Sequence, residues 1–313
     1  MSAANARMLI PISITSGMVK AGTTVAEPDT TVGESAWVAS ASYTLGQEKT
    51  YSGSIYICVK AHSGSAVTPD NDPINWLRKG PTNRTALFDD YINTSTTAVT
   101  TLTYVIQPGF FNGLSMWKLE GDTYSITVKD SPGGAVIGSK SGDLYEQAAG
   151  FYELLFQLLS KVESISMSDI PIAPNAEVTI VLTAGGSNAV SIGTLKLGDW
   201  RYLFSTGTWG GTQYGASSNR TSYTYREYNE DGTLKRIVAR PSARDVRCSV
   251  VLSDEDGTYA DSVLTSVLDT AVVFEATDIP KYGYLNTIGF VSSDITADNY
   301  GKTTINLTIK GNI

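Results

Sequence analysis

The sequence predicts a mainly β protein with a C-terminal α+β part. Thr, Ser, Gly and Tyr are abundant, while charged residues make up only 17% against about 25% in a typical globular chain. Residues 177–183 and 303–310 alternate apolar and polar side chains, which is the period of a half-buried strand. Residues 259–268 instead have apolar side chains at helical spacing. With 313 residues and 42% hydrophobic residues, the chain is long enough for two or three domains.

Residues 1–85 are expected to form an N-terminal strand, over residues 6–16, and a small aromatic β module. From Trp37 onward, aromatic residues alternate with Gly-containing turn signals, in an order similar to small chitin-binding-type carbohydrate modules. Aromatic faces pack well against sugars, but they also supply the core of a module this small. Core filling is our preferred interpretation, and glycan binding is the alternative. The candidate glycan-binding set is Trp37, Tyr43, Tyr51, Tyr56 and Trp76.

The segment after Trp76 is predicted to be a junction between this module and the following β-rich body. Gly80 and Pro81 end a strand, Asn83 tolerates turn geometry, and Arg84 offers five hydrogen-bond donors to nearby carbonyls. We expect a buried hinge here, with a ligand site as the alternative.

Residues 86–204 are predicted to form a β-sandwich of the jelly-roll kind. Thr-, Val- and Tyr-rich runs are separated by turn signals at residues 121–122, 131–134 and 185–188.

Residues 205–240 are expected to be a Gly-rich loop followed by a β-hairpin arm. Residues 205–222 contain many glycines and polar side chains, which favours a long ordered loop or arm. Residues 223–228 and 234–238 flank Asp231-Gly232, a strong hairpin signal. An exposed hairpin offers free edges to another chain, so we expect an assembly role for Tyr214, Tyr223, Tyr225 and Tyr228.

Residues 241–313 are predicted to form an α+β docking domain of ferredoxin-like character. Strands are expected at residues 245–252, 272–276, 285–294 and 303–310, with one helix at residues 259–268.

Several classes of chemistry find no support in the residues. His62 is the only histidine, so His-based metal clusters and His-dependent nucleophilic catalysis are not expected. The acidic run at residues 254–256 lacks the ligand spacing of a calcium loop and is interpreted as a turn before a helix. Asp70 and Asp72 are interpreted as a solvated turn, and the Gly-rich residues 207–215 lack the features of a phosphate-binding loop.

The charge and the cysteines set further expectations. A net charge of −8 without a Lys/Arg run argues against nucleic-acid binding. Cys58 and Cys248 are expected to be separate buried thiols in strands. Pro11 interrupts the apolar run near the N-terminus, and no apolar run is long enough to span a bilayer. We therefore expect neither a signal peptide nor membrane insertion.

Short segments spread over nearly the whole chain carry a resemblance to a known family. They include Met-Leu-Ile-Pro-Ile at residues 8–12, Val-Ala-Glu-Pro-Asp at 25–29 and Ile-Tyr-Ile-Cys at 55–58. Trp76, Gly-Pro-Thr-Asn-Arg at 80–84 with Phe-Asp at 88–89, and Gly-Thr-Gln-Tyr-Gly-Ala at 211–216 complete the pattern. Together these segments resemble a family of tailed-bacteriophage virion proteins, which are usually encoded among tail or baseplate genes.

The resemblance implies a structural, non-enzymatic subunit of a phage tail, made in the host cytoplasm and resident in the virion. Its expected partners are tail-tube, baseplate or fibre subunits and further copies of itself. It also implies a galactose-binding-like sandwich, in which residues 151–162 would be a buried strand, with a helix as the alternative. No catalytic motif, cofactor or metal is attached to the family. A receptor-binding adhesin that recognises host surface polysaccharide is the alternative function, and a capsule-degrading enzyme is a third.

Overall fold

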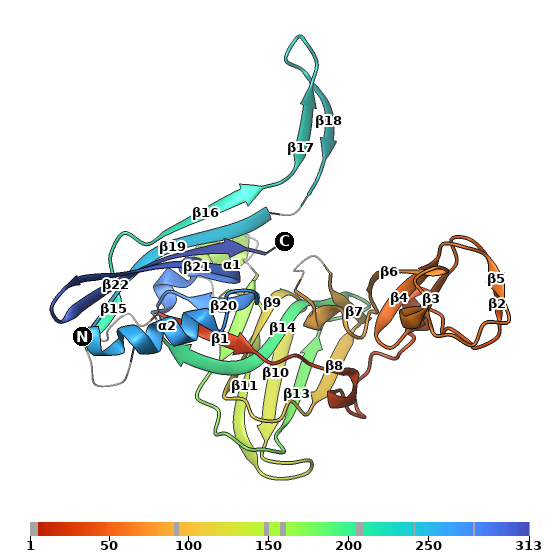
Figure 1. Ribbon diagram of the computed structural model, residues 1–313, viewed down its shortest axis with the longest axis horizontal. Coiled ribbons are helices and arrows are strands. Elements are labelled where there is room, and N and C mark those ends of the chain that lie inside the picture. The colour runs from red at the N-terminus through yellow and green to blue at the C-terminus, as the bar shows by residue number, and fades with distance from the viewer. Residues whose placement is uncertain are drawn as a thin grey trace. The chain divides into compact units, whose positions relative to one another are not determined.

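The computed structural model describes residues 6–90, 94–146, 150–156, 161–204, 209–240, 242–277 and 279–312. The described chain is mainly β, and its sheet pairings are antiparallel (Figure 1). The prediction of a mainly β fold is therefore confirmed. The chain's contacts divide it into two compact units, and each unit is built from separate segments of sequence. We call Ser13–Phe111 with Met116–Leu195 the N-terminal unit, and Met1–Ile12, Asn112–Ser115 and Lys196–Ile313 the C-terminal unit.

The first part of the N-terminal unit is a small module of short strands. Strands β3 (Glu48–Tyr51), β4 (Ser54–Cys58) and β6 (Trp76–Pro81) form a three-stranded antiparallel sheet. Strands β2 (Ser42–Tyr43) and β5 (His62–Ser63) form a two-stranded ladder. The aromatic-rich segment is thus a compact β module, as the spacing of its turn signals predicts.

The second part of the N-terminal unit contains a four-stranded antiparallel sheet in the order β11-β10-β13-β8. Side chains alternate between buried and less buried along β8 and β13, so one face of this sheet is packed and the other is more accessible. Strand β7 pairs with the first half of β14, and β12 lies next to β9 in the strand order. The strands are β7 (Thr96–Val99), β8 (Thr101–Ile106), β9 (Gly113–Glu120), β10 (Thr123–Lys129), β11 (Val136–Asp143), β12 (Ser164–Met167), β13 (Glu177–Thr183) and β14 (Ala189–Tyr202).

The expectation of a buried strand at residues 151–162 is wrong where the structure describes this segment. Helix α1 (Phe151–Phe156) lies here, and Phe151 and Phe156 are 77% and 71% exposed. The run contains no β-branched residue before residue 162, and Leu and Glu favour helices. Tyr152 and Phe156 are four residues apart with ring centroids at 5.1 Å, a spacing that stabilises a helix. Residues 157–160 lie outside the described chain.

The C-terminal unit is built on one antiparallel strand order, β1-β20-β21-β22-β19, with the second half of β14 pairing β1 on its other side. Helix α2 (Gly257–Thr265) follows β19 and buries Ala260, Val263 and Leu264 in the core of this unit. The strands are β1 (Arg7–Pro11), β19 (Ser242–Leu252), β20 (Val272–Glu275), β21 (Asn286–Asn299) and β22 (Lys302–Gly311). The order of strands and helix along residues 241–313 is the one predicted from periodicity.

The direction of the strands differs from a ferredoxin-like domain. Strand β19 is antiparallel to β22, β22 to β21, and β21 to β20, so β19 and β20 run in opposite directions. A crossover helix in a ferredoxin-like unit instead joins parallel strands of one sheet. Periodicity reveals which residues form strands, but it carries no information about strand direction, and this part of the expectation is therefore corrected.

Most of residues 210–222 form two strands, joined by a loop at residues 213–216, rather than the expected long loop or arm. Strand β15 (Gly210–Thr212) pairs with the end of β19, and β16 (Ser217–Ser222) pairs with its beginning. Both strands extend the same antiparallel sheet, although their sequences are polar and Gly-rich. The pairing with β19 is made by main-chain hydrogen bonds, which do not depend on the side chains. Residues 205–208 lie outside the described chain.

Candidate assembly interface

The predicted hairpin arm exists, as strands β17 (Tyr225–Tyr228) and β18 (Leu234–Val238) (Figure 1). Its tip is closed by a hydrogen bond from Asn229 N to Thr233 O at 2.8 Å. The backbone N–H and the hydroxyl of Thr233 both donate to Asp231 Oδ1, at 2.9 and 2.6 Å. Gly232 has φ +81°, a left-handed conformation that glycine adopts without a steric cost. The Asp-Gly signal therefore gave the correct tip.

Cross-strand pairs place apolar and charged side chains along the arm. Tyr225 lies opposite Val238, and Tyr228 lies opposite Leu234 beyond a bulge. Lys235 Nζ lies 2.6 Å from Glu227 Oε1, an ion pair exposed enough to contribute only a few tenths of a kcal/mol, roughly. The register of the arm is thus set mainly by its turn and its backbone pairing.

Both strands of the arm remain exposed. Tyr225, Tyr228, Leu234 and Ile237 are 47–59% exposed, although side chains of this size usually bury most of their area. In the described chain, β17 and β18 pair only with each other, as a separate two-stranded sheet. A lone two-stranded hairpin is only marginally stable in water. Exposed apolar side chains of this kind are typical of a surface that another chain covers.

The four predicted arm tyrosines fall into two places. Tyr223, Tyr225 and Tyr228 belong to the arm or its base, where Thr224 Oγ1 donates to Arg240 O at 3.2 Å. Tyr214 lies apart from them, in the loop between β15 and β16, and is fully exposed. Leu234 and Ile237 were not among the predicted arm residues, although their apolar character within a hairpin signal could have identified them.

The predicted glycan-binding rings mostly fill the core of the N-terminal module. Tyr43, Tyr56 and Trp76 are buried, together with Cys58. Trp37 and Tyr51 are partly buried and pack against this cluster, with their ring centroids 5.6 Å apart and edge to face. This placement favours core filling over a glycan-binding face, because buried rings present no open surface to a sugar.

His62 belongs to the same aromatic cluster. Its ring centroid lies 5.5 Å from those of Tyr43 and Trp76, and its Nδ1 lies 3.0 Å from Lys60 O. The imidazole therefore packs between rings and contacts a carbonyl, an arrangement that accounts for it as a packing residue.

The predicted junction is a buried polar network within the N-terminal unit. Asn83 is 8% exposed, and its side-chain Nδ2 donates to Asp29 Oδ2 at 2.6 Å and to Thr97 O at 2.9 Å. Its Oδ1 accepts from Thr97 N at 2.9 Å, and its backbone N–H donates to Glu34 Oε1 at 2.7 Å. One asparagine thus connects the loop before the module, the end of β6 and strand β7.

The other junction residues make their contacts mainly through backbone atoms. Gly80 and Pro81 end strand β6 and pair with Ile55 and Ser54 of β4. The carbonyl of Arg84 accepts from the hydroxyl of Tyr104 at 2.8 Å, and burial raises the pKa of that hydroxyl well above its usual range. These contacts bury part of the segment, and all of it lies within the N-terminal unit. The expected hinge between two domains stays a prediction.

Asp29 is the charged member of the network. Its burial alone would raise the pKa of the carboxyl, but hydrogen bonds from the hydroxyl of Thr31, from Asn83 and from Thr31 N outweigh this effect and lower the pKa. No local pattern identifies Asp29 and Glu34 as partners of Asn83, because they lie 54 and 49 residues away in the chain.

Two further predictions concern the cysteines and the acidic run at residues 254–256. Cys58 and Cys248 are both buried and free, in β4 and β19, as predicted. Asp254–Asp256 form a short 3-10 helix directly before α2, which confirms the acidic turn. Within the described residues, no three His, Cys, Asp or Glu side chains gather in a way that could hold a metal ion.

A search of the described chain for membrane-crossing helices finds none of sufficient length and apolar character. Comparison of the chain with protein-family models, with curated proteins and with solved structures finds no match in any of the three.

Proposed function

We propose that this chain is a structural component of a bacteriophage tail, a non-enzymatic virion subunit that docks through its hairpin arm. The neighbours it would contact are the tail tube, the baseplate, fibre subunits or further copies of itself. The observation that carries the proposal is the exposed arm of β17 and β18, with Tyr225, Tyr228, Leu234 and Ile237 at its surface. The resemblance of short segments along the sequence to phage tail proteins supports the identity of the assembly.

The energetics of the arm support docking. Covering a side chain such as Tyr228 or Ile237 on association contributes about 25 cal/mol per Å² of apolar surface removed from water. The two strands also have outer edges whose main-chain groups can extend a sheet in another chain. An arm that is marginal alone and stable when covered is the expected behaviour of an assembly element.

The charge of the arm favours self-association. Residues 223–240 contain four Lys or Arg and three Asp or Glu, whereas the whole chain has a net charge of −8. The arm is therefore slightly basic within an acidic protein, and another copy does not repel it. We accordingly propose a closed homo-oligomer, because symmetric closure satisfies every arm.

In this proposal the N-terminal unit faces outward and decorates the tail or supports fibres. Its four-stranded sheet would be one layer of a jelly-roll or galactose-binding-like sandwich, which the alternation of buried side chains along β8 and β13 supports. The adhesin alternative relied on Trp37, Tyr43, Tyr51, Tyr56 and Trp76, and it is the weaker candidate because three of these rings are buried.

The first test is the mass of the purified protein in solution, measured by light scattering during size exclusion. We expect the wild type at a multiple of its 33.4 kDa chain mass, and a shift toward the monomer when Tyr228→Ser and Ile237→Ser are combined. The variant Tyr300→Ser is the control, because Tyr300 is even more exposed than the two arm residues but lies between β21 and β22, outside the arm. It should leave the mass unchanged.

The second test is mass spectrometry of purified virions. The proposal predicts this chain at a copy number in fixed ratio to other tail proteins. A wild type that stays monomeric at every concentration would remove the self-assembly part, and absence from intact virions would refute the tail assignment itself.

A further inference from the structure

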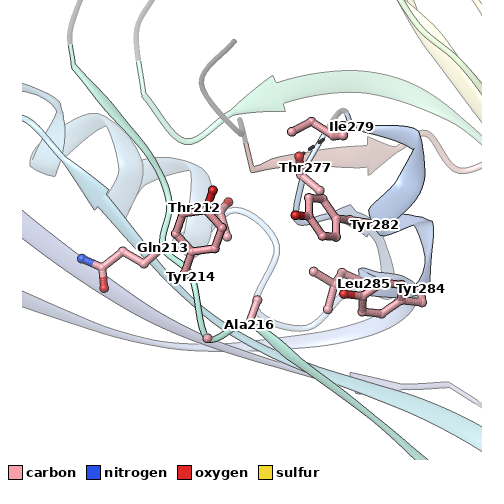
Figure 2. A pocket seen from close by; sticks show the side chains of 10 residues that line it. Thr212, Gln213, Tyr214, Ala216, Thr277, Ile279, Tyr282, Tyr284 and Leu285 are labelled. Carbon is pink, nitrogen blue, oxygen red and sulfur yellow. Dashed lines mark hydrogen bonds between the residues drawn. The ribbon is translucent and has the colours of Figure 1, made fainter. Parts of the chain in front are cut away.

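A cavity of about 300 Å³ lies within the C-terminal unit, between the loop that joins β15 to β16 and a wall formed by Thr277, Ile279, Tyr282, Tyr284 and Leu285 (Figure 2). We propose that it binds a neutral saccharide, with one pyranose ring in the cavity. This inference goes beyond the structural role proposed above and does not depend on it. It assigns sugar recognition to the C-terminal unit rather than to the N-terminal aromatic module.

Tyrosine rings form the walls of the cavity. Figure 2 shows Tyr214 and Thr212 on one side, and Tyr282, Tyr284 and Leu285 on the other. Tyr282 and Tyr284 lie edge to face, with centroids 6.2 Å apart. Tyr214 is fully exposed and Tyr284 is 54% exposed, so their rings are accessible to a ligand. The C–H face of a pyranose packs against accessible rings of this kind.

The wall containing Tyr282 is anchored in the core of the unit. Leu285 is a buried member of that core, and Tyr282 and Ala216 pack against it. Gln213 N donates to Ser249 O at 2.8 Å, which ties the opposite loop to β19, while Figure 2 shows the Gln213 side chain pointing away from Tyr282. Both walls are therefore held by the sheet, and a pre-formed cavity of this kind loses little freedom on binding.

Two hydroxyl groups lie among the rings. Thr212 Oγ1 donates to Ala276 O, and its oxygen can also accept from a ligand hydroxyl. Thr277 Oγ1 accepts from Ile279 N at 3.2 Å, and its hydrogen can be donated in turn. With the phenol groups of the tyrosines, the cavity combines apolar faces and hydroxyl partners, the combination that sugars require.

The charge of the lining selects the ligand class. The described lining residues are threonine, glutamine, tyrosine, glycine, alanine, isoleucine and leucine, with no charged side chain among them. Among these described residues, a phosphate, carboxylate or ammonium ligand would find no side chain of opposite charge. The volume is at the lower end of the range of about 300–1,000 Å³ for ligand pockets, which suits one ring rather than a long oligosaccharide.

The test is saturation-transfer NMR of the full chain with glucose, galactose, mannose and N-acetylglucosamine, each measured separately. We expect transfer to the ring protons of at least one of these sugars. The variants Tyr214→Ala and Tyr284→Ala should each weaken its binding about tenfold, the loss expected for one aromatic contact. Both side chains are exposed, and the circular dichroism spectrum of each variant serves as the check on folding.

Two controls locate the site. Tyr300→Ala removes a tyrosine that is fully exposed but does not line the cavity, and it should leave the signal unchanged. Trp37→Ala removes a partly buried ring of the N-terminal module, and it should also preserve it. Absence of transfer from all four sugars would overturn the proposal. A signal that persists when Tyr214→Ala and Tyr284→Ala are combined would also overturn the proposal. A signal that disappears in Trp37→Ala alone would overturn it as well. The solution mass of the cavity variants reports separately on assembly.

Discussion

A single asparagine illustrates how much one residue can organise. Asn83 uses both its amide nitrogen and its carbonyl oxygen on buried partners, Asp29 and Thr97. Buried polar groups must be paired in this way, because an unpaired one costs about 1–3 kcal/mol. The sequence indicated a junction at Asn83 from the neighbouring Gly80 and Pro81, but the partners of Asn83 are set by tertiary packing and had no local signal.

The Asp29 carboxylate gives this network a dependence on pH. We expect Asp29→Asn to lower the stability by about 2 kcal/mol at pH 7, because the variant loses charge-assisted hydrogen bonds from Thr31 and Asn83. The pKa of Asp29 is lowered in the folded state from its ordinary value of 3.8. Its stabilisation is therefore full well above the unfolded pKa of 3.8 and is lost as the pH falls through the folded pKa.

The measurement is the melting temperature of wild type and variant at pH 7 and at pH 3, followed by tryptophan fluorescence. The difference between them should narrow at pH 3. An equal difference at both pH values would show that the carboxylate charge contributes nothing to the network. Asp70→Asn is the control, because Asp70 lies on an exposed turn.

At the scale of elements, local sequence signals succeeded where the element depends on its own residues. The Asp-Gly tip, the alternation of β13 and β22, and the apolar spacing of α2 are all local. Strands β15 and β16 were missed because their polar, Gly-rich sequences become strands only by pairing with β19. The buried strand expected at α1 follows from the sandwich that the resemblance implies, with a helix as the alternative, whereas Phe151, Tyr152, Leu155 and Phe156 are exposed on a helix.

At Gly289, strands β21 and β22 lie too close together to leave room for a side chain. A Cβ atom at this position would lie 1.9 Å from the carbonyl oxygen of Lys310, a backbone atom that moves only with its strand. We expect Gly289→Ala to destabilise the protein by about 1–3 kcal/mol, the usual cost of overpacking. Thermal unfolding of the variant measures this loss.

Gly283→Ala is the matched control for that substitution. Gly283 lies in the same unit, and a Cβ atom there would meet nothing within 4 Å. A Gly289→Ala variant as stable as Gly283→Ala would mean that β21 and β22 separate easily, which would contradict their tight pairing.

At the scale of the whole molecule, the predicted division at residues 85, 204 and 240 assumed that domains follow the chain in order. The structure instead assembles each compact unit from separated segments. Strand β1 lies between β14 and β20, and its Met8 is fully buried in the same core as Phe274. Local patterns could not reveal this arrangement, because β1 and β20 are more than 260 residues apart.

The arrangement predicts that residues 241–313 do not fold alone. Without β1, the edge of β20 and the core around Phe274 are exposed, and the ion pair between Arg7 and Glu275, at 2.6 Å, is lost. We therefore expect a fragment of residues 196–313 to give a poorly dispersed amide NMR spectrum. Joining residues 1–12 to its N-terminus through a flexible linker should restore dispersion, because it returns β1 to its place. A well-dispersed spectrum from residues 241–313 alone would show that this segment is an independent docking domain, and that β1 only covers a finished fold.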